Sequence, residues 1–474
     1  MYWRTRLLES EAHPLPPLYP GLLPIIGHTY ILLGDTSKLW LTLKKICDYS
    51  LQHEGVISAK LGFQIYYFIS DPEDALVAAN TCLNKHFLYS FANYWLGEGL
   101  VTGFGDHWHR HRQMLKSCFS LPVINRYIEV FNSQSRILLS SFERSTGKGN
   151  LYPTEHINTY TLESSYATTF GKTANDETTL QQYMKATDEM VSLMMKRFQK
   201  FWLHGDFIYT LLGYKKQESE LVKFRDGITD EIIQTKSSFF NESKLNTKST
   251  YVSYQPFLHL ILEQHTKNAF TDQEITEELH TAMVAAYETT SISLQTILLM
   301  IGSFPKVQER MYEEILQVLG TDRDIDKEDL RKLIYTEAVI KESMRVVPTS
   351  PAIARSVDKD VKLKNYTMRT GSQCIILLHG LHRHSSWGPD ADQFKPERWL
   401  DPATLPAYVA TDATFSFGKR SCIGKTYAMT SLKIAVAHIV RKFIITADYT
   451  KVQYQYEITL HPVSGHDISL ERRN

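Results

Sequence analysis

Residues 415 to 424 read F-S-F-G-K-R-S-C-I-G, and this segment is the most informative part of the sequence about the fold. Cys422 follows Gly418 and Arg420, and Gly424 comes just before a predicted helix. Glycine permits a positive φ and a close approach of the backbone to a ligand. A helix N-terminus and a nearby arginine both favour the thiolate form of cysteine. The loop is therefore suited to a ligating thiolate, and the alternative is a buried structural cysteine.

The composition excludes several classes of protein. The chain has 474 residues with 52 basic and 52 acidic ones, so nothing indicates a nucleic-acid-binding protein. Its 5 cysteines are widely spaced and form no C-x-x-C, which argues against a disulfide framework or a structural zinc site. No run of about 18 apolar residues is present, so no transmembrane helix is expected.

Hydrophobic periodicity predicts a chain that is mainly α with a minor β region. The clearest helix begins at the capping-box pattern T-D-Q-E of residues 271–274 and continues without Gly or Pro to Met300. It is apolar on most sides, so we expect it to be buried. Further helices are predicted at 305–320, 329–346 and 423–442, and strands at 55–61, 64–69, 361–363 and 374–378, with hairpins towards residue 470.

The cysteine loop resembles the haem-binding signature of cytochromes P450. The five fixed positions of that signature are occupied by Phe415, Gly418, Arg420, Cys422 and Gly424. The resemblance implies the cytochrome P450 fold, a helical body around a buried haem with small antiparallel sheets. It also implies that Cys422 is the axial ligand of the haem iron. Arg420 is suited to bind a haem propionate, and Phe415 to shield the sulfur from water.

Two other motifs resemble elements of the same family that support the cysteine loop. Glu342 and Arg345 are three residues apart on a predicted helix and therefore share a face. Arg398 follows in the sequence F-K-P-E-R-W. The resemblance implies that these three side chains form a buried charge triad, with a structural role in retaining the haem.

A histidine-rich segment, G-D-H-W-H-R-H-R, contains Trp108 and Arg112. It resembles the W-x-x-x-R motif whose two residues contact a haem propionate, and Arg355 occupies the place of another propionate-binding arginine. The histidines at 107, 109 and 111 also suggest a metal site. Because a spacing of two residues on a helix scatters side chains over different faces, we do not expect one.

On the long helix, residues 285–290 read A-A-Y-E-T-T, which resembles the oxygen-activation motif of the family. The resemblance implies that Thr289 binds the oxygen ligand and that Glu288 relays protons to it. Taken alone, the pattern also fits a threonine bonded back to its own helix and a solvated glutamate. Ala286 stands where the family usually has glycine, which narrows the site for dioxygen.

The wider segment E-L-H-T-A-M-V-A-A-Y-E-T-T resembles the branch of fatty-acid ω-hydroxylases and insect microsomal enzymes. Some members carry a glutamate esterified to the haem where this chain has Ala285, so non-covalent haem b is expected. The implied pocket includes Ala285, Ala286, Ser350 and Ala354. These residues are largely apolar, so the expected substrate is lipophilic: a fatty acid, a steroid or terpenoid hormone, or a xenobiotic.

Electrons for O2 must come from another protein, because no G-x-G-x-x-G fingerprint is present. The resemblance implies NADPH and NADPH–cytochrome P450 reductase, with cytochrome b5 as a second partner. A basic patch for an acidic partner is expected from Arg110, Lys116, Lys419, Lys425 and Lys433.

The expected organisation is an N-terminal tail and Pro-rich hinge at 1–36, followed by one catalytic domain at 37–474. The membrane anchor of microsomal relatives is apparently missing from residues 1–36, and the expected location is the cytosolic face of the endoplasmic reticulum membrane. An apolar cluster is available to dip into the membrane surface, and ordinary core is the alternative; it comprises Phe198, Phe201, Trp202, Leu203, Phe207, Ile208, Leu211 and Leu212.

Two other functions remain open for this fold. One is a peroxide isomerase or dehydratase, which needs no proton relay. The other is a non-catalytic haem-binding sensor or carrier, for which Ala286 is the only support.

Overall fold

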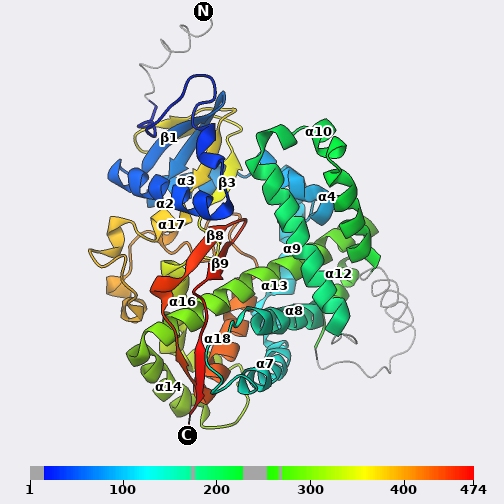
Figure 1. The fold of residues 1–474 in the computed structure, drawn as a ribbon, viewed down its shortest axis with the longest axis vertical. Coiled ribbons are helices and arrows are strands. Elements are labelled where there is room, and N and C mark those ends of the chain that lie inside the picture. The colour runs from blue at the N-terminus through cyan, green and yellow to red at the C-terminus, as the bar shows by residue number, and fades with distance from the viewer. Residues whose placement is uncertain (1–14, 172–176, 228–253, 266–269, 474) are drawn as a thin grey trace, which may run out of the picture. The chain divides into compact units, whose positions relative to one another are not determined.

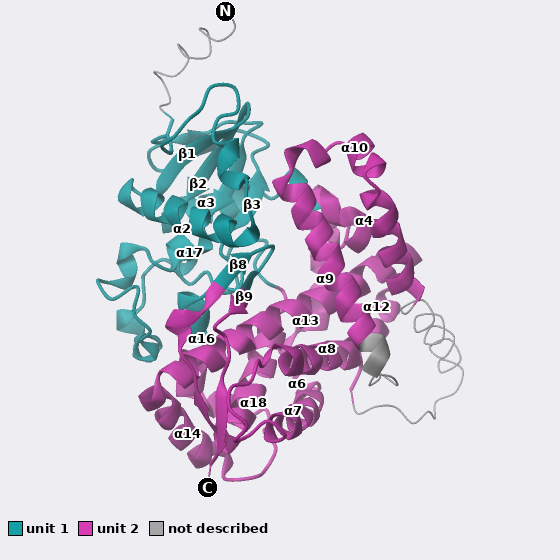
Figure 2. Cartoon of the chain, in the orientation of Figure 1, with its two compact units in different colours: residues 1–89, 341–422, 454–461 teal, residues 90–340, 423–453, 462–474 magenta. Residues whose placement is uncertain are grey.

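The computed structural model describes residues 15–171, 177–227, 254–265 and 270–473. The chain divides into two compact units (Figure 2). Unit 1 comprises residues 1–89, 341–422 and 454–461, and unit 2 comprises 90–340, 423–453 and 462–474. Both units are built from segments that are far apart in the sequence. The single catalytic domain expected from the sequence stays a prediction.

Unit 1 contains a four-stranded sheet in the order β1-β2-β6-β3. Its strands are β1 (Val56–Leu61), β2 (Gln64–Ile69), β3 (Ile353–Ser356) and β6 (Gln373–Ile376). β1 and β2 form a hairpin, β3 is antiparallel to β6, and β2 runs parallel to β6. The expected small antiparallel sheets are present, and the parallel pairing of β2 with β6 is an addition to them. Parallel pairing is possible here because about 300 residues separate β2 from β6, so no tight turn constrains their direction.

The Pro-rich stretch is part of unit 1. The backbone N–H of Ser58 in β1 donates to the carbonyl of Pro17 at 2.9 Å, and Tyr19 N–H donates back to Ser58 at 2.8 Å. The Ser58 hydroxyl donates to the Pro16 carbonyl at 3.0 Å. Proline lacks an N–H but keeps its carbonyl, so it can still accept from the free edge of β1. The described part of the expected hinge is therefore bonded to the sheet.

Unit 1 also contains helices and short strands outside this sheet. They are η1 (Thr29–Leu32), α2 (Thr36–Gln52), α3 (Pro72–Thr81), β4 (Val361–Lys362), β5 (Thr367–Met368), α17 (Leu378–Leu381), η5 (Ser385–Trp387), η6 (Pro396–Trp399), η7 (Pro402–Thr404) and η8 (Val409–Thr411). Of these, α2 and α3 lie against the sheet (Figure 1). Four elements span a boundary between the units along the chain: η2 (Phe87–Ala92), α16 (Ile334–Val346), β8 (Gln453–Tyr456) and β9 (Leu460–Ser464).

Unit 2 is mainly helical and is organised on α13 (Asp272–Ser303) (Figure 1). The predicted capping box is present, because the Thr271 side chain accepts from the Glu274 backbone and the Glu274 side chain accepts from Thr271. α13 lies alongside α8 (Thr154–Phe170). It is long and apolar enough to cross a membrane, but 78% of its most apolar window is buried in the fold. The finding agrees with a core helix, as the sequence predicted.

Unit 2 contains further helices. They are α4 (Asn93–Leu96), α5 (Gly105–Leu115), η3 (Lys116–Phe119), α6 (Leu121–Asn125), α7 (Ile128–Glu143), α9 (Glu177–Gln199), η4 (Phe201–Leu203), α10 (Asp206–Leu211), α12 (Phe257–His265), α14 (Pro305–Leu319), α15 (Asp329–Lys332), α18 (Lys425–Lys442) and η9 (Tyr449–Lys451). Of these, α4, α12, α14 and α18 contact α13. A small sheet pairs β7 (Phe443–Thr446) with β10 (Ser469–Arg472).

The helix predicted at 329–346 is two helices, α15 and α16, separated at Leu333. Leu333 leaves helical geometry with φ −77° and ψ 69°, and its side chain is fully buried. The carboxylate of Glu314 then accepts the backbone N–H groups of Tyr335 and Thr336 at 2.6 and 2.8 Å. These N–H groups begin a helix and need an external acceptor, so a partner 21 residues upstream allows the break.

Candidate functional site

The cysteine loop of unit 1 folds back on itself immediately before α18. The backbone N–H of Cys422 donates to the carbonyl of Phe415 at 2.9 Å, and Ser421 N–H donates to Gly418 at 3.2 Å. Among the five cysteines, Cys422 alone is exposed, and the other four are buried. Cys422 therefore lies on a loop that leads directly into a helix N-terminus, where an anion is favoured.

Two residues of this loop have left-handed backbone conformations. Gly418 has φ 71°, and a Cβ there would lie 3.0 Å from the Ala79 methyl and from Asn80 Oδ1. Glycine is needed at this position for both reasons. Ser416 has φ 56°, which is uncommon for a residue with a side chain and marks local strain. A positive φ was also expected at Gly424. This expectation is wrong, because the φ of Gly424 is −86°.

Glu342, Arg345 and Arg398 lie in one buried ion-pair network. Arg345 donates Nε and Nη2 to the two carboxylate oxygens of Glu342, each at 2.8 Å, and Arg398 Nε donates to Oε1 at 2.9 Å. The Lys395 backbone and the Trp399 indole donate to the same carboxylate at 2.9 Å. Burial by itself raises the pKa of Glu342, but Arg345 and the other donors outweigh it and lower that pKa. The carboxylate is therefore ionised and saturated with donors.

His382 connects this network to the cysteine loop. Arg345 Nη1 donates to the His382 carbonyl at 2.8 Å, and His382 Nε2 accepts the backbone N–H of Ala413 at 3.1 Å. Ala413 in turn accepts the N–H of Ser416 at 2.9 Å. Burial, with repulsion from Arg345 and Arg383, lowers the pKa of His382 well below its usual value. A neutral imidazole has the lone pair that this bond needs.

Three basic side chains of unit 1 repel one another: Arg355, which is buried, and Lys85 and Arg420, which are half-buried. Burial, and then repulsion from Arg355, lowers the pKa of Arg420 to about 9. Burial, Arg355 and Arg420 lower the pKa of Lys85 well below its usual value. Arg355 is 2% exposed, and its Nε has no hydrogen-bond acceptor among the residues that the structure describes. Such a cluster is costly unless an anion joins it.

In unit 2, the A-A-Y-E-T-T segment lies on α13. Most of this helix is buried, but Ala285 and Thr289 are exposed and share a face, four residues apart. Ala286 and Glu288 are half-buried. The Thr289 hydroxyl donates to the Ala285 carbonyl at 2.7 Å. This is the hydrogen bond to its own helix that the sequence analysis gave as an alternative role for this threonine. That bond uses the hydroxyl proton and leaves the oxygen lone pairs available.

Trp108 and Arg112 lie on α5, where Trp108 is buried and Arg112 is half-buried. In unit 1, Ala354 and Arg355 lie on β3, and Ser350 and Ala354 are half-buried.

A family model for cytochrome P450 matches residues 17–464. The chain belongs to the cytochrome P450 family. It is similar to human cytochrome P450 4V2, at 26% identity over 98% of this chain and 91% of the relative. It is also similar to cytochrome P450 4c21 of Blattella germanica, at 26% identity over 99% and 95% of the two chains. Cytochrome P450 4X1 of Rattus norvegicus is 27% identical over 100% and 93%.

These relatives confirm the resemblance stated from the sequence, and with it the fold class. The P450 is therefore a haem monooxygenase, an oxidoreductase that uses O2 and receives electrons from a redox partner.

The residues of unit 1 fit a haem. A haem carries two anionic propionates, and the Lys85–Arg355–Arg420 cluster supplies positive charge in the unit that also contains the exposed Cys422. Sequence reasoning missed Lys85, because no motif contains it. Its position depends on a β-bridge between Lys85 and Arg355, which are 270 positions apart in the chain. Sequence reasoning also missed His382, because no motif contains it.

Two expectations about polar side chains of this P450 are wrong. Lys433 is 7% exposed, and its Nζ pairs with Glu337 and donates to the Leu330 carbonyl, so it does not contribute to a surface patch. The second wrong expectation is that the three histidines of α5 lie on different faces of the helix. His107 and His111 are four residues apart, share a face and meet Glu274. His109 alone of the three lies exposed, bonded to Gln113.

Proposed function

We propose that this P450 inserts one oxygen atom of O2 into a lipophilic small molecule, with electrons from NADPH through a reductase. The proposed substrate is a fatty acid, a steroid or terpenoid, or a xenobiotic. Support for the class comes from the family-4 relatives and from the apolar residues Ala285, Ala286 and Ala354 of the expected pocket.

The observation that carries the proposal is the exposed Cys422, three residues before α18 in the chain, in a unit where the buried Arg355 and the half-buried Lys85 and Arg420 repel one another. In the proposed mechanism Cys422 binds the iron as a thiolate, and Arg355, Arg420 and Lys85 neutralise the propionates. Trp108 and Arg112 bind propionate from α5. The haem, when bound, supplies the iron that activates dioxygen.

The proton-transfer residues lie on α13. We propose that Glu288 takes protons from solvent and relays them toward the bound oxygen, and that the Thr289 hydroxyl oxygen accepts a hydrogen bond from the proton donor and so orients it. The half-buried position of Glu288 and the exposed hydroxyl of Thr289 support this role. Ala285 has no carboxylate to form an ester, so the haem b is proposed to be held without a covalent bond.

The absorption spectrum of the reduced protein with carbon monoxide tests the proposal. A red-shifted Soret band is expected for thiolate ligation, and Cys422→Ser should abolish it. A band at the position given by histidine ligation would contradict the assignment. Turnover is then measured with NADPH and reductase on a panel of fatty acids, steroids and xenobiotics. Turnover that requires a hydroperoxide but no NADPH would support the isomerase alternative instead.

We further propose that the protein lies on the cytosolic face of the endoplasmic reticulum membrane. Six apolar side chains at η4 and α10 support this: Phe201, Trp202, Phe207, Ile208, Leu211 and Leu212 are 58, 43, 79, 39, 73 and 56% exposed. The ordinary-core alternative is therefore wrong for these six. Of the same expected cluster, Leu203 is buried at 1% exposure and does not form part of this surface, and Phe198 is half-buried.

A further inference from the structure

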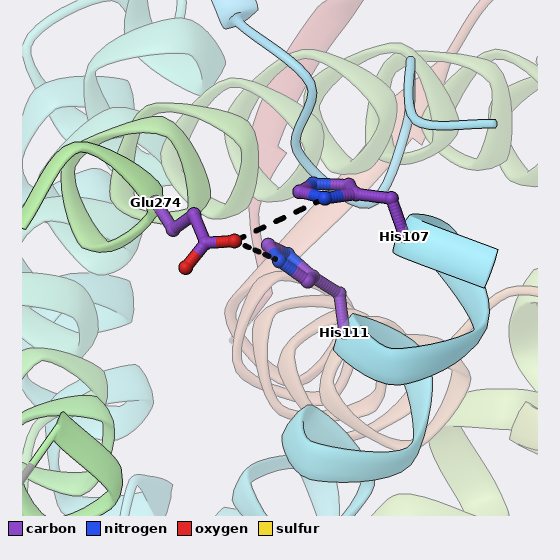
Figure 3. Close-up of side chains that lie close together, drawn as sticks. All are labelled: His107, His111 and Glu274. Atoms are coloured by element: carbon purple, nitrogen blue, oxygen red, sulfur yellow. Dashed lines mark hydrogen bonds and ion pairs between the residues drawn. The ribbon is translucent and has the colours of Figure 1, made fainter. Parts of the chain in front are cut away.

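Two histidines and a glutamate meet in unit 2, where α5 contacts the first turn of α13 (Figure 3). His111 Nε2 lies 3.2 Å from Glu274 Oε1, and His107 Nδ1 lies 3.9 Å from the same oxygen. The three ligand atoms lie within 4.8 Å of one another. Ligands about 2.0–2.1 Å from a tetrahedral zinc are about 3.3 Å apart, so little movement would be needed to enclose an ion.

A buried carboxylate orients the central histidine. His111 Nδ1 lies 2.6 Å from Glu278 Oε1, and both side chains are fully buried. The bond assigns the proton to Nδ1, which donates to Glu278 and leaves the Nε2 lone pair directed at Glu274. Metal-binding histidines are typically held this way, with a carboxylate behind the ring. A lone pair and a carboxylate facing each other at 3.2 Å need a cation or a second proton between them.

The other two groups are available as ligands. Glu274 Oε2 accepts the Thr271 backbone N–H at 2.8 Å in the capping box, which leaves Oε1 for another partner. Burial opposes ionisation of Glu274, but Thr271, His111 and Arg110 outweigh it and hold its pKa at about 2, so it is a carboxylate at neutral pH. His107 Nε2 is buried without a hydrogen-bond partner among the described residues, so no such bond fixes this ring elsewhere.

We propose that His107, His111 and Glu274 bind a divalent transition metal ion, for which Zn²⁺ is the best fit, with water in a fourth position. Two imidazoles and one carboxylate are a ligand set that zinc accepts. The ion would join α5 to α13 and so stiffen the helix that carries Trp108 and Arg112. Nothing in this inference depends on the proposed substrate or electron donor.

The Arg110 side chain competes with a metal ion for the position between His111 and Glu274. Its guanidinium donates to Glu274 Oε1 and lies 3.1 Å from His111 Nε2, so it compensates the same groups that a metal would bind. The Arg110 side chain is 44% exposed and can move into solvent when an ion displaces it. Zinc binding is therefore expected to displace the Arg110 ion pair.

The test uses the holoprotein, freed of metal with a chelator, and Zn²⁺ added alone in isothermal titration calorimetry. One Zn²⁺ per chain is expected for the wild type, checked by metal analysis after gel filtration. Glu278→Gln removes the carboxylate behind His111 and should weaken Zn²⁺ binding by about 10–100-fold, as is typical for such supporting residues. His107→Ala removes a metal ligand itself and should weaken Zn²⁺ binding by more than that. Arg110→Gln should tighten binding several-fold.

His109→Ala is the matched control, since it removes an exposed histidine from the same helix but not from the cluster. Circular dichroism confirms that each variant is folded. The proposal is overturned if the wild type binds no Zn²⁺, as expected when a second proton on His111 fills the gap. It is also overturned if His107→Ala binds as tightly as the wild type, or if His109→Ala loses binding equally.

Discussion

Arg355 is a buried cation in unit 1 whose Nε has no acceptor among the described residues. Replacing it by glutamine removes one charge that binds a propionate, so haem should leave the protein faster. The expected change is roughly 10-fold or more, on the scale of 1.5–3 kcal/mol for one hydrogen bond to a charged group. Transfer of haem to an excess of apomyoglobin measures the rate. Arg369→Gln is the control, because Arg369 is 38% exposed and pairs with Asp360; equal rates in both variants would contradict the role.

Thr289 carries the hydroxyl proposed to orient the proton donor by accepting a hydrogen bond from it. Thr289→Ala should retain haem but divert oxygen to hydrogen peroxide, while Thr289→Ser, which keeps a hydroxyl, should behave like the wild type. General acid–base groups typically contribute about 10²–10⁴-fold to a rate. Peroxide formed per NADPH consumed is the measurement. Unchanged coupling in Thr289→Ala would show that the hydroxyl does no more than bond to the Ala285 carbonyl.

At the scale of elements, α16 and η6 are joined through the Glu342 carboxylate, which is fully buried with Arg345 and Arg398. Glu342→Gln leaves the buried Arg345 without an anion, and Arg398 keeps only Asp390 Oδ1 at 3.5 Å, so the free energy of unfolding should fall by about 3–5 kcal/mol. Urea denaturation followed by circular dichroism measures it. Glu328→Gln is the control: its pair with Arg331 is 54 and 68% exposed and should be worth at most about 1 kcal/mol.

The His382 link between this network and the cysteine loop should make stability depend on pH. Burial keeps the folded pKa of His382 well below its usual value of about 6.5, whereas the unfolded chain takes up the proton near that value. The unfolded state therefore binds more protons in acid. Stability from this residue is present above pH 6.5 and is lost, at about 1.4 kcal/mol per pH unit, as the pH falls below it.

His382→Gln keeps an acceptor for the Ala413 N–H but removes this titration. Its unfolding free energy should fall less steeply between pH 6.5 and 5 than that of the wild type, by about one proton's slope. His109→Gln, on the exposed side of α5, is the comparison that should keep the wild-type slope. Identical slopes in all three proteins would show that His382 does not control the loop through its charge.

At the scale of the whole molecule, the apolar surface at η4 and α10 should bind membranes. Phe207→Glu combined with Leu211→Glu replaces two side chains that are 79 and 73% exposed. Sedimentation with phosphatidylcholine vesicles should show less bound protein for the double variant. Ile137→Glu, at an isolated residue of α7 that is 57% exposed, should bind like the wild type. Equal binding by all three would place the membrane contact elsewhere.

Local patterns predicted the elements better than their pairing. The capping box at Thr271 and the strands at 55–61 and 64–69 were predicted, because the residues that form each of them are adjacent in the chain. The parallel pairing of β2 with β6 and the break at Leu333 were not, because their partners lie 21 to about 300 residues away. No periodicity within a strand or helix specifies a partner at that distance.

The same distinction holds for the candidate sites. The sequence by itself determined the family and the cysteine loop, because the positions from Phe415 to Gly424 lie within ten residues and their chemistry is local. Only the tertiary structure brought Lys85 to Arg355 and Arg420, and Glu274 to His107 and His111. Charge repulsion and metal coordination depend on distances of a few ångströms in space, which are decided by packing between segments far apart in the chain.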